Sequence, residues 1–336
     1  MAEASRPARL LKGLAAVLLA LSGGVVHGQQ SVRQLETNGL VARGYANQQQ
    51  VELAAARTHR PWIWEARRGD ARLWIAGCLH LGAEPDQMAF PTYLPYYERA
   101  GVIYFEVMPA SWENPDINAL LSRRGFVPDR RTIEGRISSR GWAEVQRTLQ
   151  NEPDLLSRVR TMEPWFAALT LSREGYRRAG LNRQNALEEY LEQRARIENK
   201  PVGALEKAQD QIFAMADTNF PDQERNLQYA LENYRRSDFG TAEIRRAWRL
   251  GDEAQLRTAL GCDSAETAGD EMHQNLLAKR NQAWVRKIES IAATGRSALL
   301  VVGVEHLVAE PQSLPSLLRA AGMVVNRVNP GGGAGR

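Results

Sequence analysis

Hydrophobic positions form short runs near both ends of the chain. Near the start, WIWEAR (62–67), RLWIAG (72–77) and GVIYFEVM (101–108) are rich in aromatic and β-branched residues and are bounded by Gly, Asp or Pro, which is typical of strands. Near the end, SALLVVG (297–303) and MVVNRV (323–328) have the same character. SALLVVG is apolar at successive positions, as expected for a strand covered on both faces in a parallel sheet.

Between these strands, residues 112–294 have mostly helical patterns. NALEEYLEQRARIENK (185–200) places leucines and a tyrosine at helical spacing and stops before Pro201. PVGALE (201–206) interrupts the helices as one short strand. A helix follows SALLVVG and a strand follows that helix, which is a β-α-β order. The sequence therefore predicts an α/β fold: a mixed or parallel sheet built from N- and C-terminal strands, with a large helical middle segment.

The first residues differ from the rest of the chain. Basic residues precede the apolar stretch GLAAVLLAL (13–21), and small residues follow it up to Gly28. This order predicts a secretory signal peptide, because the apolar core is too short to span a bilayer comfortably. An uncleaved membrane anchor is the alternative. The predicted organisation is a signal peptide at 1–28, a polar lead-in at 29–60, a single domain at 61–328 and a flexible tail at 329–336.

Removing the leader changes the charge balance. The whole chain has 43 basic and 39 acidic residues, and the leader holds three of the former and one of the latter, which leaves a net charge of +2. Basic and acidic residues alternate elsewhere, as on solvated helix faces. The sequence therefore indicates no nucleic-acid partner. It predicts a bacterial protein of the periplasm or medium with no permanent membrane span after cleavage, and it leaves the oligomeric state open.

Export also bears on the two cysteines. In an oxidising compartment, Cys78 and Cys262 are candidates for a disulfide. Pairing requires Cα atoms within about 7 Å of each other, and the sequence does not supply that distance. Both the disulfide and two separate thiols therefore stay open.

One short phrase occurs twice, each time after an apolar run. Gly77 precedes His80 by three residues, and Gly303 precedes His306 by three. Glycine lets the backbone turn sharply or approach a ligand closely, so both glycines are candidate structural turns. In open α/β sheets, ligands bind beyond the carboxyl ends of the strands, where both histidines are expected. A hydrogen-bonded structural role is the plainer interpretation of each histidine taken alone.

Acidic residues end two further strands. Glu106 ends GVIYFE, and Glu206 ends PVGALE. Two imidazoles and one carboxylate suit a divalent transition metal and leave a position for water, whose pKa the ion lowers. One histidine could instead act as a general base without metal. Glu305, beside the second histidine, is expected to point away from its neighbour.

A series of segments, in order, resembles the TraB/GumN family, which includes bacterial GumN-like exported proteins and the animal Tiki proteins. The segments include PWIWEARRGDARLWIAGCLHLG, KPVGALEKAQDQI, LLAKRNQAWVRKI and LLVVGVEHLVAEPQSLPSLLRAAGMVVNRV, and the resemblance covers roughly residues 61–328. It implies an α/β core with two similar halves, related in fold to the erythromycin esterases and the haem-binding ChaN-like proteins. Three positions depart from the family pattern: Cys78, Glu305 with Val304, and Lys207.

The resemblance also implies roles for individual residues. In Tiki-like members the two histidines and the acid resemble a metal-dependent protease site, which here implies Mn, Co or Zn on His80 and His306. Glu106 would be the third ligand or the general base. Arg280 would hold a polar group of the substrate or an oxyanion. Asn281 and Glu206 are further candidate binding residues. A solvated helix face is the plainer interpretation of both Arg280 and Asn281.

These observations predict a metal-dependent hydrolase of the cell envelope, peptidase-like, acting on a peptide or small-molecule substrate. A non-enzymatic envelope protein that binds haem, a metal or a partner in polysaccharide machinery is one alternative. A metal-free esterase is another, in which a histidine acts on water and Glu106 orients it. The sequence contains no G-x-S-x-G, H-E-x-x-H, P-loop or dinucleotide-binding motif.

Overall fold

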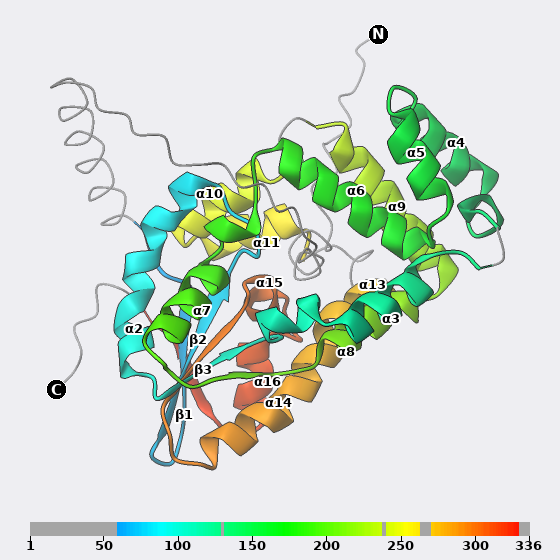
Figure 1. Ribbon diagram of the computed structural model, residues 1–336. Helices are drawn as coiled ribbons and strands as arrows, with labels where there is room; N and C mark the ends of the chain where they lie inside the picture. Colours follow the sequence, from blue (N-terminus) through cyan, green and yellow to red (C-terminus); the bar gives the residue numbers. More distant parts are fainter. Residues whose placement is uncertain (1–58, 129–130, 237–239, 263–269, 329–336) are drawn as a thin grey trace, which may run out of the picture.

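The computed structural model describes residues 59–128, 131–236, 240–262 and 270–328 (Figure 1). The expected signal peptide and tail, and all but the last two residues of the polar lead-in, lie outside these ranges. Predictions for those segments stay predictions.

Six strands form one mixed sheet in the order β4-β3-β5-β2-β1-β6. Four neighbouring strands, from β4 to β2, run parallel, whereas β1 is antiparallel to both of its neighbours. This confirms the α/β class and a sheet drawn from both ends of the chain, to which the helical middle adds only β4. The strands are β1 (Ile63–Arg68), β2 (Ala71–Cys78), β3 (Val102–Phe105), β4 (Val202–Ala204), β5 (Ala298–Gly303) and β6 (Val324–Arg327).

Helices cover both faces of the sheet. Figure 1 shows α2 (Leu94–Arg99) and α7 (Leu187–Ile197) on one side, and α14 (Lys279–Ala292) and α16 (Leu314–Ala320) on the other. Helix α7 confirms the pattern at 185–200. It ends at Ile197, and Asn199, which has a positive φ, follows shortly before Pro201. The short turn η1 (Glu84–Tyr93) precedes α2.

A second group of helices extends beyond the carboxyl ends of the parallel strands (Figure 1). Its centre is the packed pair α6 and α9, and its apolar side chains form clusters separate from the sheet core. Within the described residues, no helix is long and apolar enough to cross a membrane. The remaining helices are α3 (Pro115–Gly125), α4 (Ser139–Thr148), α5 (Pro153–Arg160), α6 (Pro164–Arg178), α8 (Ala208–Ala216), α9 (Phe220–Tyr234), α10 (Ala242–Leu250), α11 (Glu253–Leu260), α13 (Glu271–His273), α15 (Glu305–Val308) and the 3₁₀ turns η2 (Pro109–Glu113), η3 (Ile133–Gly135) and η4 (Arg183–Asn185).

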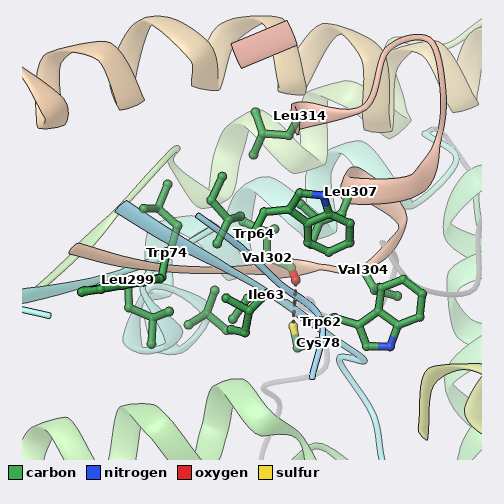
Figure 2. Packing of buried hydrophobic residues seen from close by; sticks show 14 of the residues in the cluster. Trp62, Ile63, Trp64, Trp74, Cys78, Leu299, Val302, Val304, Leu307 and Leu314 are labelled. Carbon is green, nitrogen blue, oxygen red and sulfur yellow. Dashed lines mark hydrogen bonds between the residues drawn. The ribbon is translucent and has the colours of Figure 1, made fainter. Parts of the chain in front are cut away.

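The register of the central strands places the two G-x-x-H phrases side by side. β2 and β5 are parallel neighbours in which Gly77 pairs with Val302 and Cys78 with Gly303. All six residues of β5 are buried, as expected for an apolar strand covered on both faces. Figure 2 shows the core around this pair, where Trp62, Val304 and Leu307 pack at the strand ends.

Gly77 has a packing role and not the expected turn. It lies inside β2 and is absent from the glycines with positive φ. A Cβ there would come within 2.9 Å of side-chain atoms of both Val304 and Leu307. Its carbonyl accepts a hydrogen bond from the indole of Trp248 at 3.0 Å. The prediction of a turn is therefore wrong for Gly77, because close packing against the segment after β5 is what requires glycine.

Candidate functional site

Two imidazoles and a carboxylate meet at the carboxyl ends of β2, β3 and β5. Nε2 of His80 lies 3.6 Å from Oε1 of Glu106, and Nε2 of His306 lies 3.7 Å from the same oxygen. All three residues are buried, with exposed fractions of 2% for His80, 4% for Glu106 and 0% for His306. The structure thus brings together the histidines of the two phrases and the strand-end acid.

Gly303 forms the floor of this meeting point. A Cβ on Gly303 would lie 2.8 Å from Nε2 of His80 and 3.3 Å from Oε1 of Glu106. Its backbone N–H donates to that same oxygen at 2.6 Å. The side chains of His80, Glu106 and His306 face a space beside Gly303, which we call the cradle. Gly303 ends β5 without a positive φ, and the close approach of three side chains, one of the two roles expected for it, explains the glycine.

His80 is oriented by a carboxylate that the sequence analysis did not select. Nδ1 of His80 donates to Oε2 of Glu188 at 2.7 Å, which leaves Nε2 buried with no hydrogen-bond partner in the structure. Burial alone lowers the pKa of His80, but the Glu188 and Glu106 carboxylates outweigh it, and the pKa rises to about 9. Glu188 lies in the first turn of α7.

His306 has neutral or cationic partners on both ring nitrogens. Nδ1 donates to Oδ1 of Asn281 at 2.6 Å, and Nε2 accepts from Nη1 of Arg280 at 3.2 Å. Burial lowers the pKa of His306 well below 6.5, and the Glu106 carboxylate does not offset it. His306 is therefore neutral near pH 7, with the proton on Nδ1.

Arg280 links the two strand-end acids. Its Nη2 lies 2.6 Å from Oε2 of Glu106 and 2.6 Å from Oε1 of Glu206. The indole of Trp284 donates to the other oxygen of Glu206 at 3.0 Å. Burial raises the pKa of Glu106, but Arg280, the two imidazoles and the backbone N–H of Gly303 together outweigh it, and the pKa falls to about 2. Glu106 is therefore ionised, and Glu206 contacts it through Arg280. We call His80, Glu106, Glu206, Arg280 and His306 the cluster.

The helix that carries Arg280 and Asn281 is irregular. The helical stretch from Glu271 to Ala292 begins with α13, passes through a π-helical segment, η5 (Gln274–Ala278), and continues as α14. π-helical segments are frequent at functional sites. Nη1 of Arg280 donates to the carbonyl of Leu276 within that segment at 2.8 Å. Both Arg280 and Asn281 are buried, so the solvated face that the sequence favoured for them is wrong.

Glu305 is also buried, although the sequence predicts that its side chain points away from that of His306. Its exposed fraction is 0%, and neither carboxylate oxygen has a hydrogen-bond partner in the structure. Burial raises its pKa to about 8. The charged groups that act on it are His80, Glu106 and Arg280, which are all part of the cluster.

Cys78 and Cys262 do not form the disulfide that export would permit. Sγ of Cys78 instead lies 3.3 Å from the carbonyl oxygen of Val302 and 3.5 Å from Oε2 of Glu188. Figure 2 shows the first of these contacts between the adjacent strands. Burial raises the pKa of the Cys78 thiol well above its ordinary value, so it is protonated and unreactive at neutral pH.

The donor atoms around the cradle have part of the geometry of a divalent metal site. Within the described residues, the group of possible ligand atoms that all lie within 4.8 Å of one another is that of Cys78, His80 and Glu188, so Nε2 of His306 would have to move toward His80 for the two to share an ion. Ligands held tetrahedrally at about 2.0–2.2 Å from an ion lie roughly 3.4 Å apart, close to the separations of Glu106 Oε1 from the two Nε2 atoms. Nε2 of His80 has no hydrogen-bond partner in the structure, and it would offer a lone pair to an ion once the ion displaces its proton. His306 already accepts a hydrogen bond from Arg280, so binding of an ion by both imidazoles requires that contact to give way.

Comparisons with known proteins agree with this architecture. The chain is 25% identical to the uncharacterized protein YbaP of Escherichia coli (strain K12) over 275 residues, which are 76% of this chain and 97% of that protein. YbaP of Shigella flexneri matches to the same extent. No solved structure matches. A sequence model of the TraB/PrgY/gumN family matches residues 62–327, which include every residue of the cluster. The chain belongs to the TraB/PrgY/gumN family.

Proposed function

We propose that this chain is a metal-dependent hydrolase in which His80, His306 and Glu106 hold the ion. The observation that supports this is the convergence of two Nε2 atoms on one carboxylate oxygen, within 3.7 Å, above a glycine that leaves the space open. A divalent ion in such a site lowers the pKa of a bound water toward neutrality. The donor set is compatible with Mn, Co or Zn.

The remaining residues of the cluster have separate tasks in this proposal. Arg280 is the buried cation next to the cradle, and its guanidinium is suited to hold a carbonyl oxygen as negative charge develops on it. Glu206 keeps Arg280 in place through Nε and Nη2. Oδ1 of Asn281 accepts a hydrogen bond from Nδ1–H of His306, so that the lone pair of Nε2 faces the cradle.

The substrate we propose is a peptide bond, with a small ester or amide as the narrower option. The side chains around the cradle are almost inaccessible to water, so a peptide reaches it only when neighbouring side chains move apart. We also propose that the protein acts in the cell envelope, as the signal-peptide pattern at 1–28 predicts.

A metal-free hydrolase is the second candidate, and one contact favours it. Arg280 already donates to His306 Nε2 and pairs with Glu106, so these groups have protein partners in the structure. In this version neutral His306 is the base for a water molecule, and Glu106 orients that water.

Haem is a weaker candidate, because both imidazoles face one carboxylate oxygen above the β5 backbone and leave no place for a porphyrin between them.

The test fills the cradle without removing any ligand. Gly303→Ala adds a methyl group 2.8 Å from Nε2 of His80, whereas Gly135→Ala, the matched control, adds one where no atom lies within 4 Å. We expect the purified wild type and Gly135→Ala to hold one equivalent of Mn, Co or Zn and to cleave a peptide library. Gly303→Ala should lose both properties while it keeps its circular dichroism spectrum.

Three results would decide between the candidates. Equal metal content in wild type and Gly303→Ala contradicts the proposed ion site. Hydrolysis by the wild type that survives complete metal removal favours the metal-free version. Binding of an ion with no cleavage of peptides, esters or amides contradicts hydrolysis and leaves an ion-binding protein.

A further inference from the structure

Three different donor types meet at Nδ1 of His80, the ring nitrogen that does not face the cradle. Sγ of Cys78, this Nδ1 and a carboxylate oxygen of Glu188 all lie within 4.8 Å of one another. Oε2 of Glu188 is 2.7 Å from Nδ1 and 3.5 Å from Sγ. Thiolate sulfur, imidazole nitrogen and carboxylate oxygen are the donors that bind zinc in proteins. We call Cys78, His80 and Glu188 the triad.

The fold holds the members of the triad together without an ion. Cys78 is the last residue of β2, and His80 follows it by two residues. Glu188 lies in the first turn of α7, whose Leu187 and Leu191 are buried in the core of the sheet. A strand end and a packed helix therefore position the three donors in advance, which lowers the cost of ordering them around an ion.

The separations in the triad fit an ion of the size of zinc. With Zn–S near 2.3 Å and Zn–N and Zn–O near 2.0–2.2 Å, tetrahedral ligands lie roughly 3.4–3.7 Å apart. The distance from Sγ of Cys78 to Oε2 of Glu188 is 3.5 Å. The 2.7 Å distance from that oxygen to Nδ1 of His80 is a hydrogen bond, and it would widen by roughly 0.7 Å when an ion replaces the shared proton.

The surroundings of the triad favour a cation and give it a way in. The carboxylates of Glu188 and Glu106 both act on the thiol of Cys78, so this part of the molecule is electronegative. Cys78 and His80 are closed to solvent, whereas the side chain of Glu188 is 13% exposed. An ion can therefore arrive from the side of Glu188. A thiol that binds zinc is deprotonated by the ion itself, so burial of the thiol does not prevent ligation.

We propose that Cys78, His80 and Glu188 form a zinc site in which water is the fourth ligand. This does not rest on the ion of the proposed function, because it uses Nδ1 of His80 and not Nε2. A neutral imidazole has one lone pair, so zinc on Nδ1 leaves the proton on Nε2 and excludes an ion from the cradle. The competing explanation is that Glu188 only orients His80 and that Cys78 only fills space.

The experiment uses Co²⁺ as the probe, because its bond to a thiolate gives a charge-transfer absorption in the near ultraviolet. An ion in the cradle gives no such band, since no thiolate faces it. Co²⁺ is added to the reduced full chain after metal removal and is then displaced with Zn²⁺. We expect the band in the wild type and in the matched control Cys262→Ser, and no band in Cys78→Ser. Glu188→Gln should weaken binding of both ions by about 100-fold.

A further variant separates the triad from the cradle. His306→Gln removes a residue of the cradle and no member of the triad, so it should keep the thiolate band. The Gly303→Ala comparison tests the cradle on its own when Mn²⁺ is the ion, because a thiolate ligand disfavours Mn²⁺.

Four results would contradict the zinc site. Absence of a thiolate band in the wild type overturns it, whatever the cradle binds. A band that survives in Cys78→Ser and disappears in Cys262→Ser assigns the ion to the other cysteine. Loss of the band in His306→Gln shows that the ion depends on the cradle and contradicts a separate site. Unchanged affinity in Glu188→Gln removes the carboxylate from the ligand set. If Cys78→Ser does not fold, the same titration on Cys78→Ala decides.

Discussion

His80 and His306 follow the same G-x-x-H phrase on adjacent parallel strands, yet their rings have opposite partners. Nδ1 of His80 donates to a carboxylate, and the pKa of this histidine rises to about 9. Nδ1 of His306 donates to an amide, Arg280 donates to its Nε2, and its pKa falls well below 6.5. Both rings are fully buried, so burial does not explain the difference.

The comparison shows that the residue on the far side of each ring determines its charge. The strands supply the same backbone position twice, while α7 and α14 supply Glu188 and Asn281. His59 shows what burial does with no carboxylate present. It bonds the carbonyl of Arg249 at 2.8 Å, and its pKa is lowered to about 4. A metal-free site therefore holds one cationic and one neutral imidazole on either side of Glu106.

The largest effect is expected when the acid that both rings face is removed. Glu106→Gln leaves the buried charge of Arg280 paired only with Glu206, so we expect the free energy of unfolding to fall by about 3 kcal/mol. Denaturant unfolding measures it. Glu289→Gln is the control, because Glu289 forms a half-exposed pair with Arg68, and a change of about 0.5 kcal/mol or less is expected. Equal losses in the two variants would contradict a buried ionic cluster.

Glu188→Gln should erase the difference between the two histidines. The pKa of His80 in the folded state is raised above its unfolded value, so the stabilisation is present below pH 6.5 and is lost as the pH rises through about 9. We expect the variant to lose about 2 kcal/mol at pH 6 and much less at pH 10. Nuclear magnetic resonance titration of His80 checks the cause. Glu189→Gln, next to it on α7 and paired with Arg183, should leave the His80 titration unchanged.

Asn281→Asp should make His306 resemble His80. It places a carboxylate at Nδ1 of His306, as Glu188 does for His80, and should raise the pKa of His306. A protonated Nε2 no longer accepts from Arg280, so that contact should weaken as well. The His306 resonances during a pH titration report the change. An unaltered titration would show that Arg280, and not Asn281, controls the charge of His306.

The smallest effect is expected for His59, whose titration shows how far burial lowers the pKa of a histidine when no carboxylate contacts it. Its folded pKa of about 4 lies below the unfolded value, so the unfolded state binds more protons between about pH 4 and 6.5, and stability rises with pH across that range. We expect His59→Gln to relieve a penalty of about 1 kcal/mol at pH 5.5 and to change little at pH 8. Thermal unfolding at both pH values measures this. A variant equally affected at both pH values would point to lost packing against Tyr93 and Trp248.

Much of the sheet and the central triad could be predicted from the chain. The apolar runs identify the strands, and the two phrases identify His80 and His306 because strand ends are short and local features. Glu188 and Glu305 could not be found in this way. An amphipathic pattern assigns acids to solvent, and whether a helix end instead faces a cavity depends on tertiary packing far away in the sequence. Close approach was one of the roles expected of the two glycines, but the side chains that crowd Gly77 and Gly303 come from other strands and loops, so the sequence could not name them.

The order of the strands has a consequence for how the protein is made. β5 is the fifth of six strands to be synthesised, yet it lies between β3 and β2 in the middle of the sheet. A nascent chain that stops short of residue 298 lacks the strand that joins the two halves of the sheet, and it also lacks His306. Chains that terminate before residue 298 should therefore be unstable, and the group formed by His80, Glu106 and His306 exists only after residue 306 has been synthesised.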